Sequence, residues 1–266
     1  MQASFGEIQK IVDHIETNFD REITAHEIEL LSHYSYRNFQ RVFFKIFNET
    51  VSGFQKRLKL ENSYKKLIYT EDKISEIAWQ VGYDNIQSFS KAFKKQFSVS
   101  PVEARKQKQD VFRQFIENGS PNLKFEIKYK DEVIVYCKFI KTKDYHNAEI
   151  DALWKEIEPE DEIFESAYGI IHDQPLITNR FHCRYGAAVT YDNDLKGFLK
   201  KEIFGRKYVK FTHYGLYEHI LGTYRSFYRF WLSEQSLLLD NSDVIEEYTE
   251  TESGEKVTHI YFPLYE

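Results

Sequence analysis

The stretch "GYDNIQSFSKAFKKQF", residues 82–97, determines how the first part of the chain folds. From Phe89 onward its aromatic residues recur every four positions, at Phe93 and Phe97, which is the spacing of one face of an α-helix. Because an α-helix turns by about 100° per residue, the polar residues point roughly away from that stripe: Gln87, Lys91, Lys94 and Lys95. The stripe predicts core packing, and the polar face needs a separate explanation.

A second copy of this pattern lies upstream. Residues 27–47 read "EIELLSHYSYRNFQRVFFKIF", and residues 76–97 read "EIAWQVGYDNIQSFSKAFKKQF". The Glu-Ile pair and the tyrosine match at an offset of 49, and the phenylalanine stripe matches at an offset of 50. Such self-similarity indicates one supersecondary unit used twice. Each copy is predicted to be a short helix, a tight turn and a longer helix.

Cap and turn residues support this arrangement. Thr24 to Glu27 has the capping-box pattern of a helix start, and Ser35 and Asn85 can cap the two longer helices. Gly82 lies in the second turn, where a left-handed residue is often required, and His33 lies at the equivalent place in the first. We therefore expect two helix-turn-helix units.

The chain is predicted to hold two domains. A helix over about 50–69 joins the two copies, and Ser100 to Glu103 starts a last helix that ends before a turn-forming cluster at 118–121. We expect a multidomain chain with an all-α double helix-turn-helix domain over 1–108, a linker over 109–122 and an α+β domain over 123–266.

Strand patterns dominate after that boundary. Helical patterns at about 147–157 and 218–232 separate six strand-like stretches. These stretches are 124–141, 164–172, 181–192, 206–215, 243–251 and 256–265. The order strand, helix, strand, strand occurs twice, so the second domain also looks like a duplicated unit.

Charge differs between the two domains. Residues 1–108 carry 17 Lys+Arg and 14 Asp+Glu, a net +3, whereas the rest of the chain carries 19 and 28, a net −9. The opposite signs suggest different partners. No stretch approaches the roughly 18 apolar residues of a membrane span. The N-terminus has no export signal, and two cysteines, Cys137 and Cys183, fit a reducing compartment, so we expect a protein of the bacterial cytoplasm with no metal and no cofactor.

The polar faces of the two longer helices correspond to each other. In copy one, Arg37 and Arg41 point away from the core stripe and Gln40 lies on its flank; the matching residues of copy two are Gln87, Ser90 and Lys91. Arg and Gln make bidentate contacts to guanine and adenine, while Lys and Ser more often bind phosphates. Such faces also occur on purely structural, solvated bundles, but two copies in register favour the reading of two successive major grooves.

The first domain also resembles a known family. Residues 5–107 look like the DNA-binding domain of AraC/XylS-type transcription regulators, and residues 76–105 closely fit that family's signature stretch. By position, the resemblance implies seven DNA contacts: Arg37, Gln40, Arg41, Gln87, Ser88, Ser90 and Lys91. Ile86 departs from the family pattern, since some relatives have a polar side chain there, and the domain is only mildly basic.

The second domain resembles the GyrI-like effector-binding fold. The likeness rests on "FHCRYGAAVTYD" (181–192), on "YVKFTHYGLYEHILGTYRSFYRFWL" (208–232) and on the last two strand stretches. The resemblance implies two strand-helix-strand-strand units about a pseudo-twofold axis, with a groove that binds amphipathic, often cationic, small molecules. It also implies that the Glu of an E-x-Y strand motif, here Glu246 before Tyr248, is the counter-charge.

Strand alternation gives an independent reason to single out Glu246. It places Val244, Glu246 and Tyr248 on one face of the strand. A carboxylate buried among aromatic rings is costly unless a cation pairs with it. The alternative is an acidic edge strand with solvated carboxylates. Further walls of the site could come from Trp154, Tyr191, Tyr228 and Trp231, each of which could equally be ordinary core.

The sequence therefore predicts a ligand-responsive transcription regulator. The resemblance implies an activator, which is the most frequent role in this family. The expected partners are a double-stranded promoter site and a small effector, with RNA polymerase as a further candidate and no membrane. Two alternatives remain. The C-terminal domain could be a small-molecule hydrolase in which Glu246 acts as general base beside a tyrosine, or it could be a sequestering or protein-binding module.

Overall fold

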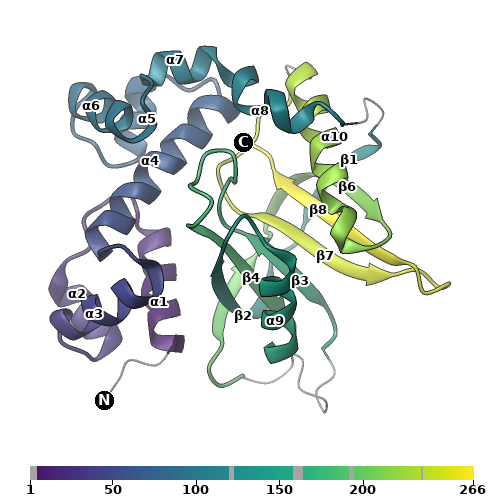
Figure 1. Cartoon of the computed structure of the whole chain (residues 1–266), viewed down its shortest axis with the longest axis horizontal. Helices are drawn as coiled ribbons and strands as arrows, with labels where there is room; N and C mark the ends of the chain where they lie inside the picture. Colours follow the sequence, from purple (N-terminus) through teal and green to yellow (C-terminus); the bar gives the residue numbers. More distant parts are fainter. Residues whose placement is uncertain (1–4, 120–122, 158–163, 192–194, 235) are drawn as a thin grey trace. The chain divides into compact units, whose positions relative to one another are not determined.

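The computed structural model describes residues 5–119, 123–157, 164–191, 195–234 and 236–266. The chain divides into two compact units, Met1–Lys106 and Gln107–Glu266 (Figure 1). Each unit has its own core. In the part of the chain that is described, no helix is both long and apolar enough to cross a membrane.

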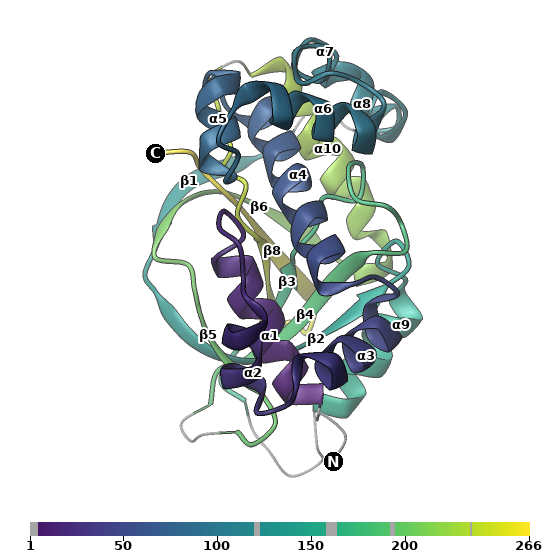
Figure 2. The ribbon, with the colours of Figure 1, turned by 90° about the vertical axis from the view of Figure 1, so that its left-hand side faces the viewer.

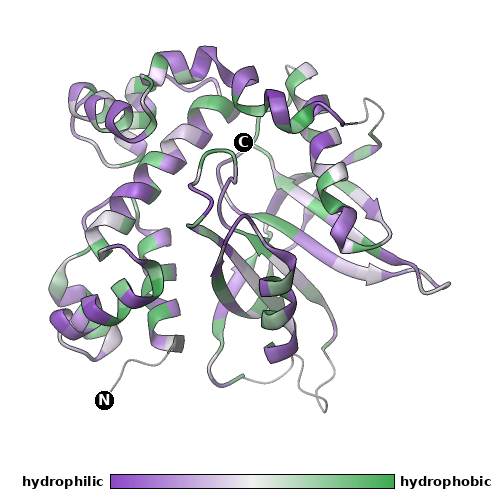
Figure 3. Ribbon diagram, viewed as in Figure 1, coloured by the Kyte–Doolittle hydropathy of each residue, from purple (hydrophilic) through white to green (hydrophobic). Residues whose placement is uncertain are grey.

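The N-terminal unit consists of helices, and α4 connects two similar groups of them (Figures 1 and 2). The helices are α1 (Phe5–Thr17), α2 (Ala25–Ser32), α3 (Tyr36–Phe47), α4 (Val51–Tyr69), α5 (Ile74–Gln80), α6 (Ile86–Phe97) and α7 (Pro101–Lys106). The pairs α2–α3 and α5–α6 are the two predicted helix-turn-helix units, and α3 and α6 are each 12 residues long. Figure 3 shows hydrophobic and hydrophilic residues side by side along these helices, as expected for amphipathic elements.

The two turns have the predicted geometry. His33 and Gly82 follow the first helix of each unit, and both are left-handed, with φ of 59° and 77°. A left-handed residue ends a helix and reverses the chain, which is why a glycine or a tolerated polar residue stands there. Asn85 caps α6 by accepting a hydrogen bond from the Ser88 amide at 2.8 Å. Ser35 makes no side-chain cap bond to α3, whose first amide, that of Tyr36, donates to Glu29 at 2.7 Å instead.

The phenylalanine stripes form the core of the N-terminal unit. All three members of the α3 stripe are fully buried, and in α6 Phe89 and Phe93 are fully buried. Helix α4 packs against both stripes: Phe54 lies 5.4 Å from Phe43 between ring centroids, and Tyr64 lies 5.3 Å from Phe93. The single long helix therefore holds both helix-turn-helix units, which confirms the interpretation of the aromatic stripe as core.

The C-terminal unit is an eight-stranded antiparallel sheet with helices. Its elements are α8 (Lys108–Ile116), β1 (Phe125–Lys130), β2 (Val133–Thr142), α9 (Asn147–Ile157), β3 (Ala167–Ile171), β4 (Cys183–Val189), β5 (Leu199–Ile203), β6 (Arg206–Tyr214), η1 (Tyr217–His219), α10 (Ile220–Ser233), β7 (Val244–Glu250) and β8 (Lys256–Pro263). The strand order is β1-β6-β8-β7-β3-β4-β2-β5.

This order confirms the predicted duplication. One unit is β2-α9-β3-β4 and the other is β6-α10-β7-β8, and they meet where β3 pairs with β7. The strand that precedes each unit pairs with the first strand of the other unit. Strand β1, before the first unit, pairs with β6, and β5, before the second unit, pairs with β2. Two details differ from the sequence prediction. The stretch 124–141 forms two strands, and β5 was not predicted because its central Lys-Lys-Glu has no apolar alternation.

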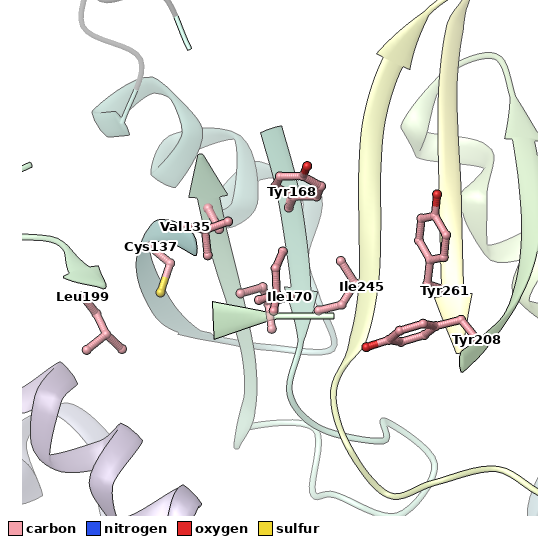
Figure 4. Packing of buried hydrophobic residues seen from close by; sticks show 10 residues of the cluster. Val135, Cys137, Tyr168, Ile170, Leu199, Tyr208, Ile245 and Tyr261 are labelled. Atoms are coloured by element: carbon pink, nitrogen blue, oxygen red, sulfur yellow. The ribbon is translucent and has the colours of Figure 1, made fainter. Parts of the chain in front are cut away.

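The sheet has a core on each face. On one face, side chains from strands β2 to β8 form a cluster that includes Val135, Ile170, Ile245 and Tyr261 (Figure 4). On the other face, Tyr185 and its neighbours pack with the apolar side of α9. Helix α10 covers the same face through Phe227, whose ring stacks on Phe211 of β6 at 4.7 Å. We call this second face the helix side.

Residues 109–122 were predicted to be a linker, but helix α8 occupies most of this stretch. Its Phe112 is fully buried because it stacks on Tyr228 of α10 at 4.7 Å between ring centroids. The Lys108 ammonium lies 3.8 Å from the centre of the Trp231 ring. Residues 108–116 thus belong to the C-terminal unit, and the predicted end of the linker, 120–122, lies outside the described residues.

Candidate functional site

The first candidate surface is the outward side of α3. Arg37 and Arg41 are exposed and Gln40 is half-buried, while the stripe on the opposite side is inaccessible. Arg41 donates to the side chain of its neighbour Asn38 at 3.0 Å, a contact that holds the guanidinium over the helix surface. Phe44 is also exposed on this helix, at 49%. The surface therefore combines cations with one aromatic ring.

The equivalent side of α6 is also open to solvent. Gln87, Ser88 and Lys91 are exposed, and Ser90 is half-buried. The structure thus places all seven predicted DNA-contact residues on accessible sides of two repeat-equivalent helices. Side chains of this kind on the second helix of a helix-turn-helix unit are those that reach base edges and phosphates.

The second candidate site lies at the seam between the two halves of the sheet. Glu246 of β7 is 1% exposed, and its carboxylate accepts three tyrosine hydroxyls. Tyr248 donates to Oε2 at 2.6 Å, Tyr217 donates to Oε2 at 3.0 Å, and Tyr224 donates to Oε1 at 2.7 Å. The prediction that Glu246 and Tyr248 share a strand face is confirmed, and the face is the buried helix side.

The hydrogen-bond network extends from Tyr248 into the other half of the sheet. Its hydroxyl lies 2.7 Å from that of Tyr185 on β4, which in turn accepts from the indole Nε1 of Trp154 on α9 at 2.9 Å. The rings of Trp154 and Tyr248 meet edge to face at 5.7 Å. We call Trp154, Tyr185, Tyr217, Tyr224, Glu246 and Tyr248 the Glu246 cluster.

A glycine makes room for this cluster. Gly169 on β3 is the register partner of Glu246 on β7. A Cβ atom at Gly169 would lie 2.2 Å from the Tyr248 hydroxyl, 2.8 Å from the Tyr185 hydroxyl and 3.0 Å from Glu246 Oε2. The network therefore depends on the absence of a side chain at this position.

The electrostatics of the cluster follow from its burial. Burial raises the pKa of Glu246 above its ordinary value, and the hydrogen bonds from the three tyrosines offset only part of that rise. Burial and the neighbouring carboxylate together raise the pKa of Tyr217, Tyr224 and Tyr248 well above the usual range, so these groups are proton donors at neutral pH. The six members of the cluster include one carboxyl group and no basic side chain.

The other residues predicted to bind ligand lie elsewhere. Tyr191 packs edge to face on Phe164 beside α9. Tyr228 and Trp231 pack on Phe112 of α8, and the Tyr228 hydroxyl accepts from Gln174 at 2.6 Å. Of the predicted set, the structure brings together only Glu246, Tyr248 and Trp154.

Three members of the cluster were not predicted: Tyr185, Tyr217 and Tyr224. A spacing signal existed for two of them, because Tyr217 and Tyr224 are seven residues apart, or two helical turns, at the start of the second helical pattern. Tyr185 had no local signal, since its approach to Tyr248 depends on β3 lying between β4 and β7. Among the described residues, no group of three or more His, Cys, Asp or Glu could hold a metal ion.

Comparison with known proteins agrees with both halves of this description. Residues 31–107 match a family described as a helix-turn-helix domain, of AraC type, and residues 124–265 match one described as a GyrI-like small molecule binding domain. The second match alone spans more than half of the chain.

Several similar curated proteins are transcription regulators by name. The transcriptional regulator Rob of Salmonella typhimurium is 29% identical over 101 residues, which are 38% of this chain and 35% of Rob. The putative HTH-type transcriptional regulator YkgA of Escherichia coli is 31% identical over 98 residues, 37% of this chain and 41% of YkgA. The chain thus spans well under half the length of these relatives.

Two of the similar solved structures each align with one part of this chain. The C-terminal domain of EcmrR aligns with 54% of this chain and 98% of its own length, at a TM-score of 0.43 and 19% identity. The DNA-binding domain of AdpA in complex with a target DNA aligns with 40% of this chain and 96% of its own length, at a TM-score of 0.37 and 15% identity. From the family matches, the chain belongs to the GyrI-like small-molecule-binding family, with an AraC-type helix-turn-helix domain preceding that domain.

Proposed function

We propose that this protein is a transcription regulator that reads promoter DNA with α3 and α6 and responds to a small molecule bound at the Glu246 cluster. The main support for DNA binding is that α3 and α6 are repeat-equivalent helices of the same length, each with a solvent-accessible polar face. Both helices are fixed to α4, so one chain can present two reading helices to successive major grooves.

Individual roles follow from side-chain chemistry. Arg37 and Arg41 on α3 and Gln87 on α6 can make bidentate contacts to base edges. Lys91, Ser88 and Ser90 suit phosphate and sugar contacts, and Gln40 lies on the flank of the reading face.

A test of the reading face is fluorescence anisotropy with a bound promoter fragment. Arg41→Ala is expected to cost about 1–3 kcal/mol of binding free energy, because a buried base contact is lost. Lys10→Ala, in an exposed position on α1, removes the same charge away from the reading helices and serves as the control. Equal effects of the two substitutions would contradict the assignment.

The chemistry of the Glu246 cluster favours a lipophilic organic cation as ligand. Among the described residues, the buried carboxyl group of Glu246 has hydroxyl partners but no cationic one, and an incoming positive charge would recover electrostatic energy that burial has cost. The rings of Trp154, Tyr217 and Tyr248 can face such a cation, which adds cation–π attraction. Tyr217 belongs to the short helix η1, just after Gly215, whose φ of 100° is left-handed.

Helix α10 offers a physical connection from this cluster to the start of the C-terminal unit. It carries Tyr224, which donates to Glu246, and one turn later Tyr228, which stacks on Phe112 of α8. Helix α8 follows α7 of the DNA-binding domain after a single residue, Gln107. Regulation requires that the ligand bind more tightly to one of two arrangements of this connection than to the other.

Calorimetric titration of the full chain with tetraphenylphosphonium tests the ligand part. Glu246→Gln, which keeps the shape but removes the charge, is expected to weaken binding at least roughly tenfold, or about 1.4 kcal/mol. A neutral analogue of the same size, tetraphenylmethane derivatised for solubility, is expected to bind weakly to both proteins. Unchanged affinity of the Gln variant for the cation would overturn the role of Glu246.

The hydrolase alternative is less well supported by the geometry. A raised pKa suits a general base, but three hydroxyl donors already occupy three of the about four acceptor positions of the Glu246 carboxyl group, so only Oε1 retains one. A base needs a free lone pair directed at its substrate. Multiple turnovers of a reactive ester by the full chain, abolished in Glu246→Gln, would establish the enzyme instead.

A further inference from the structure

The β1 edge of the sheet carries an exposed apolar stripe. Among the described residues, β1 pairs with β6 on one side and with no strand on the other. On its helix side, Phe125 is 42% exposed, Ile127 is 59% exposed and Tyr129 is 55% exposed. An edge strand with an open apolar row is a template for pairing with another strand.

The opposite edge of the same sheet is built differently. Strand β5 is the pseudo-symmetric counterpart of β1, since each precedes one repeat and pairs with the first strand of the other. The helix-side positions of β5 next to Tyr136 and Ile134 hold Lys200 and Glu202. Charged side chains of this kind are a common protection against strand pairing. The β1 edge lacks that protection on the helix side.

The sequence of β1 is complementary to itself in one antiparallel register. If Ile127 lies opposite Ile127 of a second copy, Glu126 lies opposite Lys128 and Phe125 lies opposite Tyr129, each pair occurring twice. Side chains on the same face meet in this register, because opposed residues in an antiparallel pair share a face. In this register, two ion pairs form on one face of the paired strands and a continuous apolar row forms on the other face.

We propose that the protein forms a homodimer in which the β1 strands of two copies pair antiparallel about a twofold axis at Ile127. The two sheets then become continuous, and the apolar stripes of the two copies adjoin. Glu126 accepts from Lys210 of β6 at 2.8 Å, so its carboxylate would lie between that ammonium and Lys128 of the second copy. Such a dimer carries two double helix-turn-helix readers.

Sedimentation velocity of the full chain at increasing concentration tests the register itself. Wild-type protein is expected to reach twice the monomer mass. Glu126→Lys alone places Lys against Lys twice, and Lys128→Glu alone places Glu against Glu twice, so each variant should dimerise at least roughly tenfold more weakly. An equimolar mixture of the two variants opposes Lys to Glu at both places and should restore the dimer.

Matched controls separate this pairing from other associations. Glu202→Lys on β5 makes the same charge change at the opposite edge and should leave the dimer unchanged. Ile127→Lys, at an exposed position that the fold tolerates, should give a monomer. The proposal is overturned if wild-type protein stays monomeric, if Ile127→Lys dimerises like wild type, or if the mixed single variants fail to associate. Pairing with a different protein or an amphipathic small molecule would leave the purified chain monomeric.

Discussion

At the scale of single residues, two adjacent glutamates of β7 have opposite environments. Burial raises the pKa of Glu246, and three tyrosine hydroxyls offset the rise only in part. For Glu247, on the other face, burial is outweighed by the Tyr261 hydroxyl at 2.6 Å and the Lys130 ammonium at 2.9 Å, so its pKa is lowered. Among the described residues, the first carboxyl group accepts from three hydroxyls, whereas the second also pairs with an ammonium group.

These opposite shifts predict opposite pH dependences of stability. A raised folded pKa means that Glu246 favours folding when protonated, so its contribution is lost as pH rises above its ordinary value of 4.5. The melting temperature of Glu246→Gln relative to wild type should therefore increase as pH rises above about 4.5.

Glu247→Gln provides the matched control for that series. Its lowered pKa stabilises the fold above the ordinary value and less so as pH falls. The variant should therefore lose melting temperature relative to wild type as pH rises from acid to neutral. Thermal unfolding of the three proteins between about pH 3 and 8, followed by circular dichroism, checks both signs, because the change for Glu247 lies mainly below its ordinary pKa of 4.5; the same sign for both variants would contradict the assigned environments.

Gly169 gives a second prediction at this scale. Gly169→Ala places a Cβ against the Tyr248 and Tyr185 hydroxyls, and overpacking of this kind costs about 1–3 kcal/mol. Gly222→Ala on α10 meets no atom within 4 Å and should be neutral or stabilise by up to about 1 kcal/mol. Urea unfolding of both variants measures the two changes in unfolding free energy. A larger loss for Gly169→Ala indicates a tightly packed cluster, whereas equal changes would indicate a loosely packed one.

The sequence predicts residues well where neighbours are local. Alternation along one strand was enough to place Glu246 with Tyr248, because that relation lies within the strand. It could not reveal Tyr185, whose approach needs the crossover that places β3 between β4 and β7. Trp231 was predicted as a ligand wall for its ring alone, but its position depends on helix α8, which packs on it.

At the scale of elements, the two reading helices begin differently. Asn85 caps α6 through the Ser88 amide, whereas Ser35 makes no side-chain bond at the start of α3. Removal of a cap that is formed costs about 1 kcal/mol of unfolding free energy. Asn85→Ala should therefore destabilise the N-terminal unit by about that amount, and Ser35→Ala by clearly less. Urea unfolding measures the difference, and equal losses of unfolding free energy for the two variants would contradict the assignment of a formed cap at Asn85 alone.

Helices of the N-terminal unit were predictable because their apolar spacing, caps and turns lie within one stretch of sequence. The full capping box at the start of α7 is an example: the Glu103 amide donates to Ser100 Oγ at 3.2 Å, and the Ser100 amide donates to Glu103 at 2.7 Å. Strand β5 was missed for the opposite reason, and the predicted helix before the 118–121 turn was not expected to pack on the C-terminal unit. Their burial comes from distant partners, β2 and α10, that local periodicity does not show.

At the scale of the whole molecule, two duplicated units are joined in one chain. The N-terminal duplication presents two equivalent helix faces, and the C-terminal duplication places one buried carboxylate at the seam of a pseudo-symmetric sheet. Helix α10 touches that carboxylate through Tyr224 and touches α8 through Tyr228. Helix α10 therefore contacts both the seam and the start of the C-terminal unit.

Selection of bound duplexes from a random DNA pool tests most directly whether α3 and α6 both read bases. The bound sequences should contain two short conserved blocks whose centres are about 10–10.5 base pairs apart, one turn of the duplex. Arg41→Ala should relax base preference in one block only, and Gln87→Ala in the other block only, by about 1–3 kcal/mol each. Enrichment of a single block, or of none, would contradict a chain that reads two grooves.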